Sequence, residues 1–148
     1  MTIRLATIED LDLLAPLFDA YRVFYRKSSD PDLARRFLSE RLRNNQSTIF
    51  LALRPDGTAA GFTQLFPTYS SVAAAPILIL NDLFVEMGAR RQGVGALLLD
   101  AAARFGRDTG AVRLTLSTEV TNSTAQALYE SQGWVRQTQF HVYNLFLS

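Results

Sequence analysis

Residues 83–96 read LFVEMGARRQGVGA, the most informative segment of the chain. The apolar run from Ile77 to Val85 leads into it and predicts a buried central strand. The apolar spacing from Val94 to Phe105 predicts that an amphipathic helix follows. A helix start carries free N–H groups and the positive end of its dipole, and glycines let an anion approach that backbone closely. The strand, the basic turn and the helix together therefore predict a pyrophosphate site.

Two better-known phosphate motifs are absent, since the chain has neither G-x-x-x-x-G-K-[ST] nor G-x-G-x-x-G. What it has is R-x-x-G-x-G, formed by Arg90, Gly93 and Gly95. This pattern resembles the central motif of the GNAT superfamily of acetyl-CoA-dependent N-acetyltransferases, [QR]-x-x-G-x-[GA], which binds the pyrophosphate of coenzyme A. The usual lead-in L-[FYA]-V is also present at residues 83–85. Taken alone, the glycines would indicate only close packing of helix on strand.

A second motif lies in residues 122–134, which read NSTAQALYESQGW. It resembles the family's other hallmark, N-x-x-A-x-x-L-Y-x-x-x-G-[FWY]. Asn122 and Tyr129 are seven residues apart and share one helix face. The resemblance implies that Asn122 bonds the pantetheine arm and that Tyr129 protonates the leaving thiolate. From the residues alone, Asn122 is equally an N-cap and Gly133 a C-cap.

The resemblance implies acetyl-CoA as the cofactor and direct attack of an amine on the thioester, through a tetrahedral intermediate. A backbone N–H near residues 83–85 would bind the oxyanion. A bulge would splay this strand from the next one, and the pantetheine arm would pair with the exposed edge. The expected cofactor-binding residues are Leu83, Phe84, Val85, Arg90, Arg91, Gln92, Gly93, Val94, Gly95, Ala96, Asn122, Ala125 and Tyr129.

The general base is less clearly marked. The sequence Asn81-Asp82-Leu83-Phe84-Val85 is similar to the E-D-[LF]-[FY]-V of small-amine acetyltransferases, where the first acid is a proposed base acting through water. Asn81 cannot accept a proton in that role. Asp82 is the nearest substitute, although adjacent strand residues point to opposite faces. The catalytic candidates are thus Tyr129, Asp82 and Asn81; Glu86, Glu119, His141 and ordered water are alternatives for the base.

Aromatic residues and cations gather near Tyr25, in the region that, by the resemblance, covers the acceptor pocket, although Tyr21 and Phe24 are better explained as core residues. The candidate substrate-binding residues are Phe24, Tyr25, Tyr69 and Glu119, and Arg22 or Arg26 could hold a substrate carboxylate. An acidic pocket would favour a polyamine instead. The resemblance places the chain nearest the small-amine branch, so a polyamine or an amino acid is the favoured acceptor. Aminoglycosides and protein N-termini stay open.

Composition sets the remaining limits. The chain has 148 residues, no cysteine and a formal net charge of +1. We expect one N-acetyltransferase domain over residues 1–148, with no bound metal, no nucleic-acid partner and no membrane span. The N-terminus lacks a signal-peptide pattern, and a cytoplasmic location is expected.

The other predicted elements complete a mixed α/β sheet flanked by about four helices. The order is β-α-α-β-β-β-α-β-α-β-β. Thr7 with Asp10, and Asp30 with Pro31, mark helix starts. The resemblance implies the GNAT fold, with a mostly antiparallel sheet and a splayed central strand pair. The predicted strands outside the central one are 3–5, 48–53, 59–66, 112–117, 134–135 and 140–147.

Two alternative functions are also consistent with parts of the sequence. The same fold could hold acetyl-CoA as a non-catalytic sensor or regulatory subunit. The absence of an acid at Asn81 favours this alternative, whereas the presence of Tyr129, a proton donor, argues against it. Alternatively, the apolar segment from Phe140 to Leu147 could pair with another chain in a structural protein. That segment is equally expected of an enzyme that forms a homodimer, which is the preferred interpretation.

Overall fold

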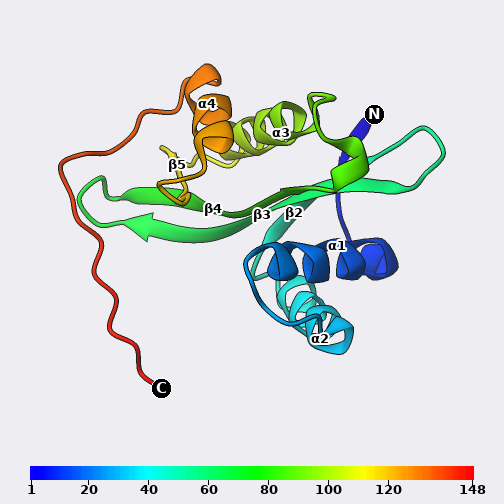
Figure 1. Ribbon diagram of the computed structural model, residues 1–148. Helices are drawn as coiled ribbons and strands as arrows, with labels where there is room; N and C mark the ends of the chain where they lie inside the picture. The colour runs from blue at the N-terminus through cyan, green and yellow to red at the C-terminus, as the bar shows by residue number, and fades with distance from the viewer. The chain divides into compact units, whose positions relative to one another are not determined.

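A five-stranded sheet organises the first of two units in the computed structural model, which describes all of residues 1–148. The units are Met1–Ser117 and Thr118–Ser148. The strand order is β1-β2-β3-β4-β5, antiparallel except for the parallel pair β4–β5 (Figure 1). The strands are β1 (Thr2–Leu5), β2 (Thr48–Leu53), β3 (Ala59–Ser70), β4 (Ala75–Val85) and β5 (Leu114–Thr115).

Helices cover both faces of this sheet (Figure 1). Helices α1 (Leu11–Phe24) and α2 (Pro31–Arg43) pack on one face, where their buried side chains form a core with Phe62 and Phe84 of the sheet. Helix α3 (Val94–Asp108) packs on the other face through Val94 and Leu98. The expected mixed α/β architecture is confirmed. One face of the sheet packs against α1 and α2, and the other packs against α3.

Local sequence signals set the helix starts. Thr7 and Asp10 form the predicted capping box, which opens the short 3-10 turn η1 (Ile8–Asp10) and then α1. Arg4 binds the carboxylate of Asp10 through two hydrogen bonds of 2.8 and 2.9 Å. Asp30 caps α2 by accepting a hydrogen bond from the N–H of Leu33, with proline at the first helical position.

The β3–β4 hairpin is longer than predicted. Strand β3 continues from the predicted end at Phe66 to Ser70, so Tyr69 lies on a strand rather than in a loop and is 80% exposed. Pro67 pairs with Leu78, which extends the ladder despite the missing N–H. Cross-strand pairing with β4, and not local propensity, decides where β3 ends.

Strands β4 and β5 diverge soon after they meet. Only two residue pairs join them, Leu78 with Leu114 and Ile79 with Thr115. The predicted strand over residues 112–117 is therefore reduced to two residues, because pairing with β4 stops there. A cavity of about 210 Å³ lies at this opening, lined by Ile79, Leu80, Asn81, Thr115, Leu116 and Ser117. The expected splayed strand pair is confirmed.

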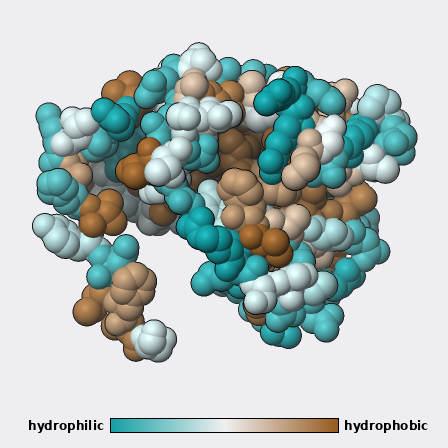
Figure 2. Space-filling model, viewed as in Figure 1, coloured by the Kyte–Doolittle hydropathy of each residue, from teal (hydrophilic) through white to brown (hydrophobic).

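The second unit contains one helix, α4 (Ser123–Ser131), which is the helix predicted after Asn122. The predicted strands at 134–135 and 140–147 are wrong, since neither segment is a strand in the structure. A strand needs a partner for its N–H and C=O groups, and the backbone of residues 135–148 makes no such pairing. Phe140, Tyr143 and Phe146 are 73%, 89% and 85% exposed, and Figure 2 shows apolar side chains gathered along this terminal segment.

No helix in the molecule combines the length and the apolar character needed to cross a bilayer. Residues capable of binding a metal ion do not cluster in groups of three or more.

Candidate active site

The basic turn between β4 and α3 keeps its backbone donors free. The 3-10 turn η2 (Met87–Ala89) closes through backbone bonds, whereas the N–H groups from Arg91 to Ala96 donate to no acceptor in the chain. Gly93 is the N-cap of α3, so no side chain caps that helix start. The free N–H groups lie where the positive end of the helix dipole adds to their charge.

The backbone conformation of this turn makes room for an anion. Arg91 and Gly93 have φ values of +65° and +77°, both in the left-handed region. A Cβ added to Gly93 would meet no atom within 4 Å, so the turn is open beside it. A non-glycine residue in this region stores about 1 kcal/mol or more of strain, which is found most often at functional sites. Free donors and open space beside Gly93 fit the pyrophosphate of coenzyme A.

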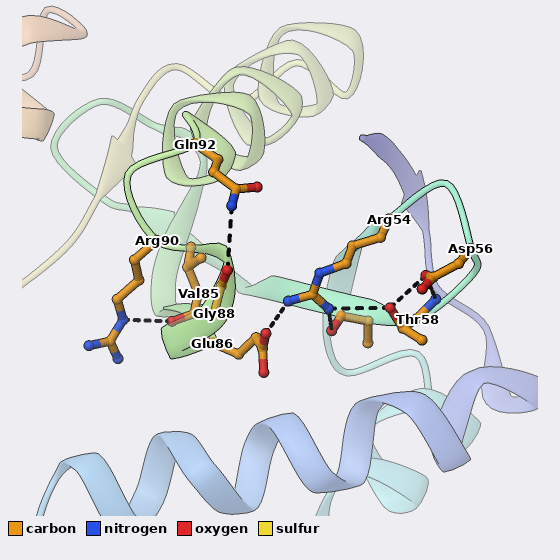
Figure 3. A network of polar contacts seen from close by, with 9 residues as sticks. Arg54, Asp56, Thr58, Val85, Glu86, Gly88, Arg90 and Gln92 are labelled. Carbon is orange, nitrogen blue, oxygen red and sulfur yellow. Dashed lines mark hydrogen bonds and ion pairs between the residues drawn. The ribbon is translucent and has the colours of Figure 1, made fainter.

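Two side chains of the turn fold back onto backbone, as Figure 3 shows. The Nε of Arg90 donates to the carbonyl oxygen of Val85 at 3.0 Å, and the Nε2 of Gln92 donates to that of Gly88 at 3.4 Å. Both interactions hold the turn in shape. The backbone from Arg91 onward is thus available to a ligand, while Arg90 and Gln92 support it.

A bulge in β4 lies beside the opening between β4 and β5. Gln64 of β3 pairs with Asp82, and the next residue of β3, Leu65, pairs with Leu80. Asn81 is therefore the extra residue of a β-bulge, in the strand where the family resemblance implied one. Beyond Ile79, the edge of β4 that faces away from β3 has no strand partner.

The bulge changes which way Asp82 and Asn81 point. The Nδ2 of Asn81 donates to a carboxyl oxygen of Asp82 at 2.8 Å, so the two side chains meet on one side of the strand. The expectation that adjacent residues point to opposite faces is wrong here, because the bulge interrupts the alternation. Asn81 is exposed and Asp82 is 2% exposed, so the amide lies at the mouth of a buried carboxyl group.

Three donors surround the carboxyl group of Asp82. Besides Asn81, the Nε2 of Gln64 donates to it at 2.5 Å, and the hydroxyl of Tyr21 hydrogen bonds to it. The single hydroxyl hydrogen of Tyr21 is shared between this carboxyl group and the carbonyl oxygen of Asn81, which lies 3.2 Å from the hydroxyl oxygen. Burial raises the pKa of Asp82 above its ordinary value, and the hydrogen bonds from Asn81, Gln64 and Tyr21 oppose that rise. A buried carboxyl group with a raised pKa next to an opening is suited to proton transfer.

Sequence reasoning missed Gln64 and counted Tyr21 as core. Gln64 is fully buried, and its Oε1 has no hydrogen-bond partner. A glutamine inside an otherwise apolar strand is the signal that could have drawn attention to it, because buried polar groups are uncommon. Its role here is to hold Asp82 from the neighbouring strand.

An aromatic cluster adjoins Asp82 on the α1 face of the sheet. Tyr21, Phe24 and Tyr25 of α1 and its C-cap meet Phe84 of β4, with ring centroids 5.1–6.5 Å apart. Phe24 is 50% exposed, so it presents a ring at the surface of this cluster. The structure brings the predicted substrate residues Phe24 and Tyr25 together near Asp82 and leaves Tyr69 at the far end of the β3–β4 hairpin.

The other candidate bases lie in different surroundings. Glu86 forms an ion pair with Arg54, the residue that follows β2 (Figure 3). Arg54 also donates a hydrogen bond to the carbonyl oxygen of Ala59. Glu119 and His141 belong to the second unit, where the carbonyl oxygen of Glu119 accepts a hydrogen bond from Gln126. The ion pair engages Glu86 and leaves Asp82 as the buried acid of the sheet.

The second motif is formed as predicted within its own unit. Asn122 caps α4 by accepting a hydrogen bond from the N–H of Ala125 at 3.1 Å. Tyr129 lies on α4, half-buried, with its ring 6.0 Å from that of Trp134. Gly133 has a φ of +90° after the helix end, as a C-cap glycine does.

A larger cavity, of about 470 Å³, lies between β1, β2 and α3. Leu5, Phe50 and Arg104 are among its lining residues, and none of the predicted site residues reaches it. The chemistry expected from the sequence is therefore associated with the smaller opening beside Asn81.

Comparison with known proteins identifies the class. The family model described as "Acetyltransferase (GNAT) family" matches residues 14–134. The chain therefore belongs to the GNAT acetyltransferase family, whose members generally use acetyl-CoA, and it is an N-acetyltransferase.

Similar proteins cover nearly the whole chain. The uncharacterized N-acetyltransferase YhfO of Bacillus subtilis (strain 168) is 48% identical over 98% of this chain and 97% of its own. The crystal structure of a probable acetyltransferase is 46% identical, covers 100% of this chain and 99% of its own, and superposes with a TM-score of 0.94. Aminoglycoside N(6')-acetyltransferase type 1 of Klebsiella aerogenes is 30% identical over 63% of this chain and 62% of its own.

Proposed function

We propose that this enzyme transfers the acetyl group of acetyl-CoA to a primary amine of a small molecule, with a polyamine or an amino acid as the favoured acceptor class. The observation that carries the proposal is the turn from Arg91 to Ala96, whose backbone N–H groups are free at the start of α3. These donors would hold the pyrophosphate, and Leu83 to Val85, on the unpaired side of β4, would line the path of the pantetheine arm.

The chain must move two protons in this reaction. The amine nitrogen forms a C–N bond to the acetyl carbon as the C–S bond breaks, so a proton leaves the nitrogen and one is added to the sulfur. We assign the first transfer to Asp82, through a water beside Asn81, because Asp82 is the buried carboxyl group at the strand opening. We assign the second to Tyr129, on the strength of the second motif, with Asn122 and Ala125 beside the cofactor.

Acceptor recognition is assigned to the aromatic cluster next to Asp82. Phe24 and Tyr25 contribute rings there, and Glu119 and Tyr69 are further candidates for the pocket. The relative from Klebsiella aerogenes acts, by its name, on aminoglycosides, which keeps that class in the test.

The two units are proposed to form one domain, a view supported by the family match across the boundary at Ser117. The terminal segment, residues 140–147, is proposed to pair with a second copy in a homodimer. Its exposed apolar side chains support this arrangement. A cytoplasmic location suits a chain without cysteine.

The direct test is to mix purified protein with acetyl-CoA and a panel of amines and to follow free thiol. The panel holds polyamines, L- and D-amino acids, aminoglycosides and a short basic peptide. We expect thiol release with polyamines or amino acids above the rate of acetyl-CoA hydrolysis without amine. Release only with the peptide would contradict the small-molecule assignment. Failure of acetyl-CoA to bind in calorimetry would contradict the placement of the pyrophosphate.

A further inference from the structure

Arg90 extends to the α1 face of the sheet rather than toward the free N–H groups of the turn. Its guanidinium carbon is 5.7 Å from the ring centre of Phe24 and 5.8 Å from that of Phe84. Phe84 belongs to the core that α1 and α2 form with the sheet, whereas α3 packs on the opposite face. The motif arginine is therefore on the same face as Asp82 and the aromatic cluster.

The guanidinium is held in place but has no ionic partner. Its Nε donates to the carbonyl oxygen of Val85, and the group lies against the neighbouring rings of Phe24 and Phe84. Arg90 forms no ion pair, and Glu86, a few residues before it, is already paired with Arg54. The two Nη groups are left to bind a planar anion, because the paired donors of a guanidinium match the two oxygens of a carboxylate.

The spacing along β4 relates this cation to the proposed base. Asp82 and Phe84 point to the same face two residues apart, about 7 Å along a strand. Arg90 contacts the ring of Phe84. Asp82 and Arg90 therefore both lie near the ring of Phe84. An acceptor that contacts both residues has its reacting amine near Asp82 and an anionic group, several bonds away, near Arg90.

We propose that Arg90 binds a carboxylate of the acceptor, so that the enzyme acts on amines bearing a carboxylate several bonds from the reacting nitrogen. This inference rests on the proposed acetyl transfer and narrows its acceptor class. No carboxylate of the first unit forms an ion pair with the guanidinium of Arg90. A polyamine would place a second positive charge near this unneutralised cation, and the two like charges would repel. An ω-amino acid instead offers a negative group at that end.

The test uses acceptors that differ only in this charge. We would compare kcat/KM for 5-aminopentanoate and for its neutral amide, 5-aminopentanamide, each of which has one amine. Wild-type enzyme should prefer the acid by on the order of 10- to 100-fold, the effect of a charge-assisted hydrogen bond. With both acceptors measured at saturating acetyl-CoA, Arg90→Gln should bring the ratio close to one. Arg90→Lys should give an intermediate ratio, because it retains the charge without the planar pair of donors.

Arg104→Gln is the matched control, since Arg104 is an exposed arginine of α3 that lines the larger cavity. It should leave both the ratio and the KM for acetyl-CoA unchanged. Equal use of the acid and the amide by wild-type enzyme would overturn the inference while leaving acetyl transfer intact. A raised KM for acetyl-CoA in Arg90→Gln, with an unchanged ratio, would assign Arg90 to the cofactor instead.

A binding measurement decides the question even without turnover. Wild-type protein titrated with 5-aminopentanoate in a calorimeter should bind it more tightly than Arg90→Gln does, while the amide should not distinguish the two proteins. Identical binding of the acid to both proteins would overturn the inference. Absence of thiol release with every amine would contradict the proposed function separately.

Discussion

The side-chain amide of Asn81 donates a hydrogen bond of 2.8 Å to the carboxyl group of Asp82, although the two residues are neighbours in one strand. Regular strand geometry would place them on opposite faces. The bulge at Asn81 makes the contact possible and places an exposed amide next to a buried acid.

The first prediction concerns the pH dependence of stability in Asp82→Asn. Burial raises the pKa of Asp82 above 3.8, so the native chain retains this proton at pH values where the unfolded chain has lost it. The stability that Asp82 contributes is full below about pH 3.8 and is lost as the pH rises toward the raised native value. Urea unfolding at a series of pH values should therefore show the variant gaining stability relative to wild type as the pH rises.

Asp19→Asn is the control for that measurement. Hydrogen bonds from Ser29 and from the N–H of Asp30 lower the pKa of Asp19, so its contribution is present above its ordinary pKa and lost as the pH falls. The Asp19 variant should lose stability relative to wild type as the pH rises, the opposite trend. A pH-independent difference for Asp82→Asn would contradict the raised pKa.

The second prediction concerns the role of Tyr129. If its hydroxyl protonates the leaving thiolate, Tyr129→Phe should lower kcat on the order of 10²- to 10⁴-fold and change acetyl-CoA affinity much less. Steady-state kinetics and calorimetry measure the two effects. Tyr143→Phe, a change of an 89%-exposed tyrosine, should alter neither. Unchanged turnover of the Tyr129 variant at every pH would remove it as the acid.

The third prediction concerns the anion cradle at Gly93. Gly93→Asp should abolish acetyl-CoA binding, because it adds a negative charge and atoms to the open space beside the free N–H groups. Calorimetric titration with acetyl-CoA measures the loss. Gly57→Asp is the matched control and should leave acetyl-CoA binding unchanged, since Gly57 also has a positive φ of +86° and open space where its Cβ would lie. Tight acetyl-CoA binding by the Gly93 variant would contradict the proposal that this turn binds the pyrophosphate.

The fourth prediction concerns the proposed homodimer. Deletion of residues 140–148 removes the exposed apolar segment and should convert a dimer to a monomer in light scattering after gel filtration. Val72→Ser removes a fully exposed apolar side chain from the β3–β4 turn and should leave the dimer intact. A monomeric full-length protein, or a dimer that survives the deletion, would contradict the proposed pairing.

Sequence reasoning succeeded wherever the signal was local. The capping box of Thr7 and Asp10, the Asp30–Pro31 start of α2 and the Asn122 cap of α4 were all predicted and are all formed. Each depends on residues within one turn of a helix, so a short stretch of sequence contains the whole interaction. The turn between β4 and α3 was predictable for the same reason, and the central strand was predictable from its unbroken apolar run.

Sequence reasoning failed where a partner strand decides the outcome. The extension of β3 to Ser70 and the shortening of β5 to Leu114–Thr115 follow from where β4 does and does not offer pairing. The strand predicted over residues 140–147 has the right composition but no strand beside it in the chain. Pairing across the sheet is a long-range property that composition does not contain.

Short sequence motifs were enough to identify the family, the helix starts and the glycine-containing turn between β4 and α3, because neighbouring residues supply the interactions that define these features. Three features depend on tertiary structure: Asn81 forms a bulge, Gln64 binds the carboxyl group of Asp82 while Tyr21 binds the carbonyl oxygen of Asn81, and Arg90 lies against Phe24 and Phe84. These contacts join residues 6 to 66 positions apart in the chain, apart from the Asn81–Asp82 pair. They form because the sheet and α1 fold against each other, and they set the electrostatics of the site.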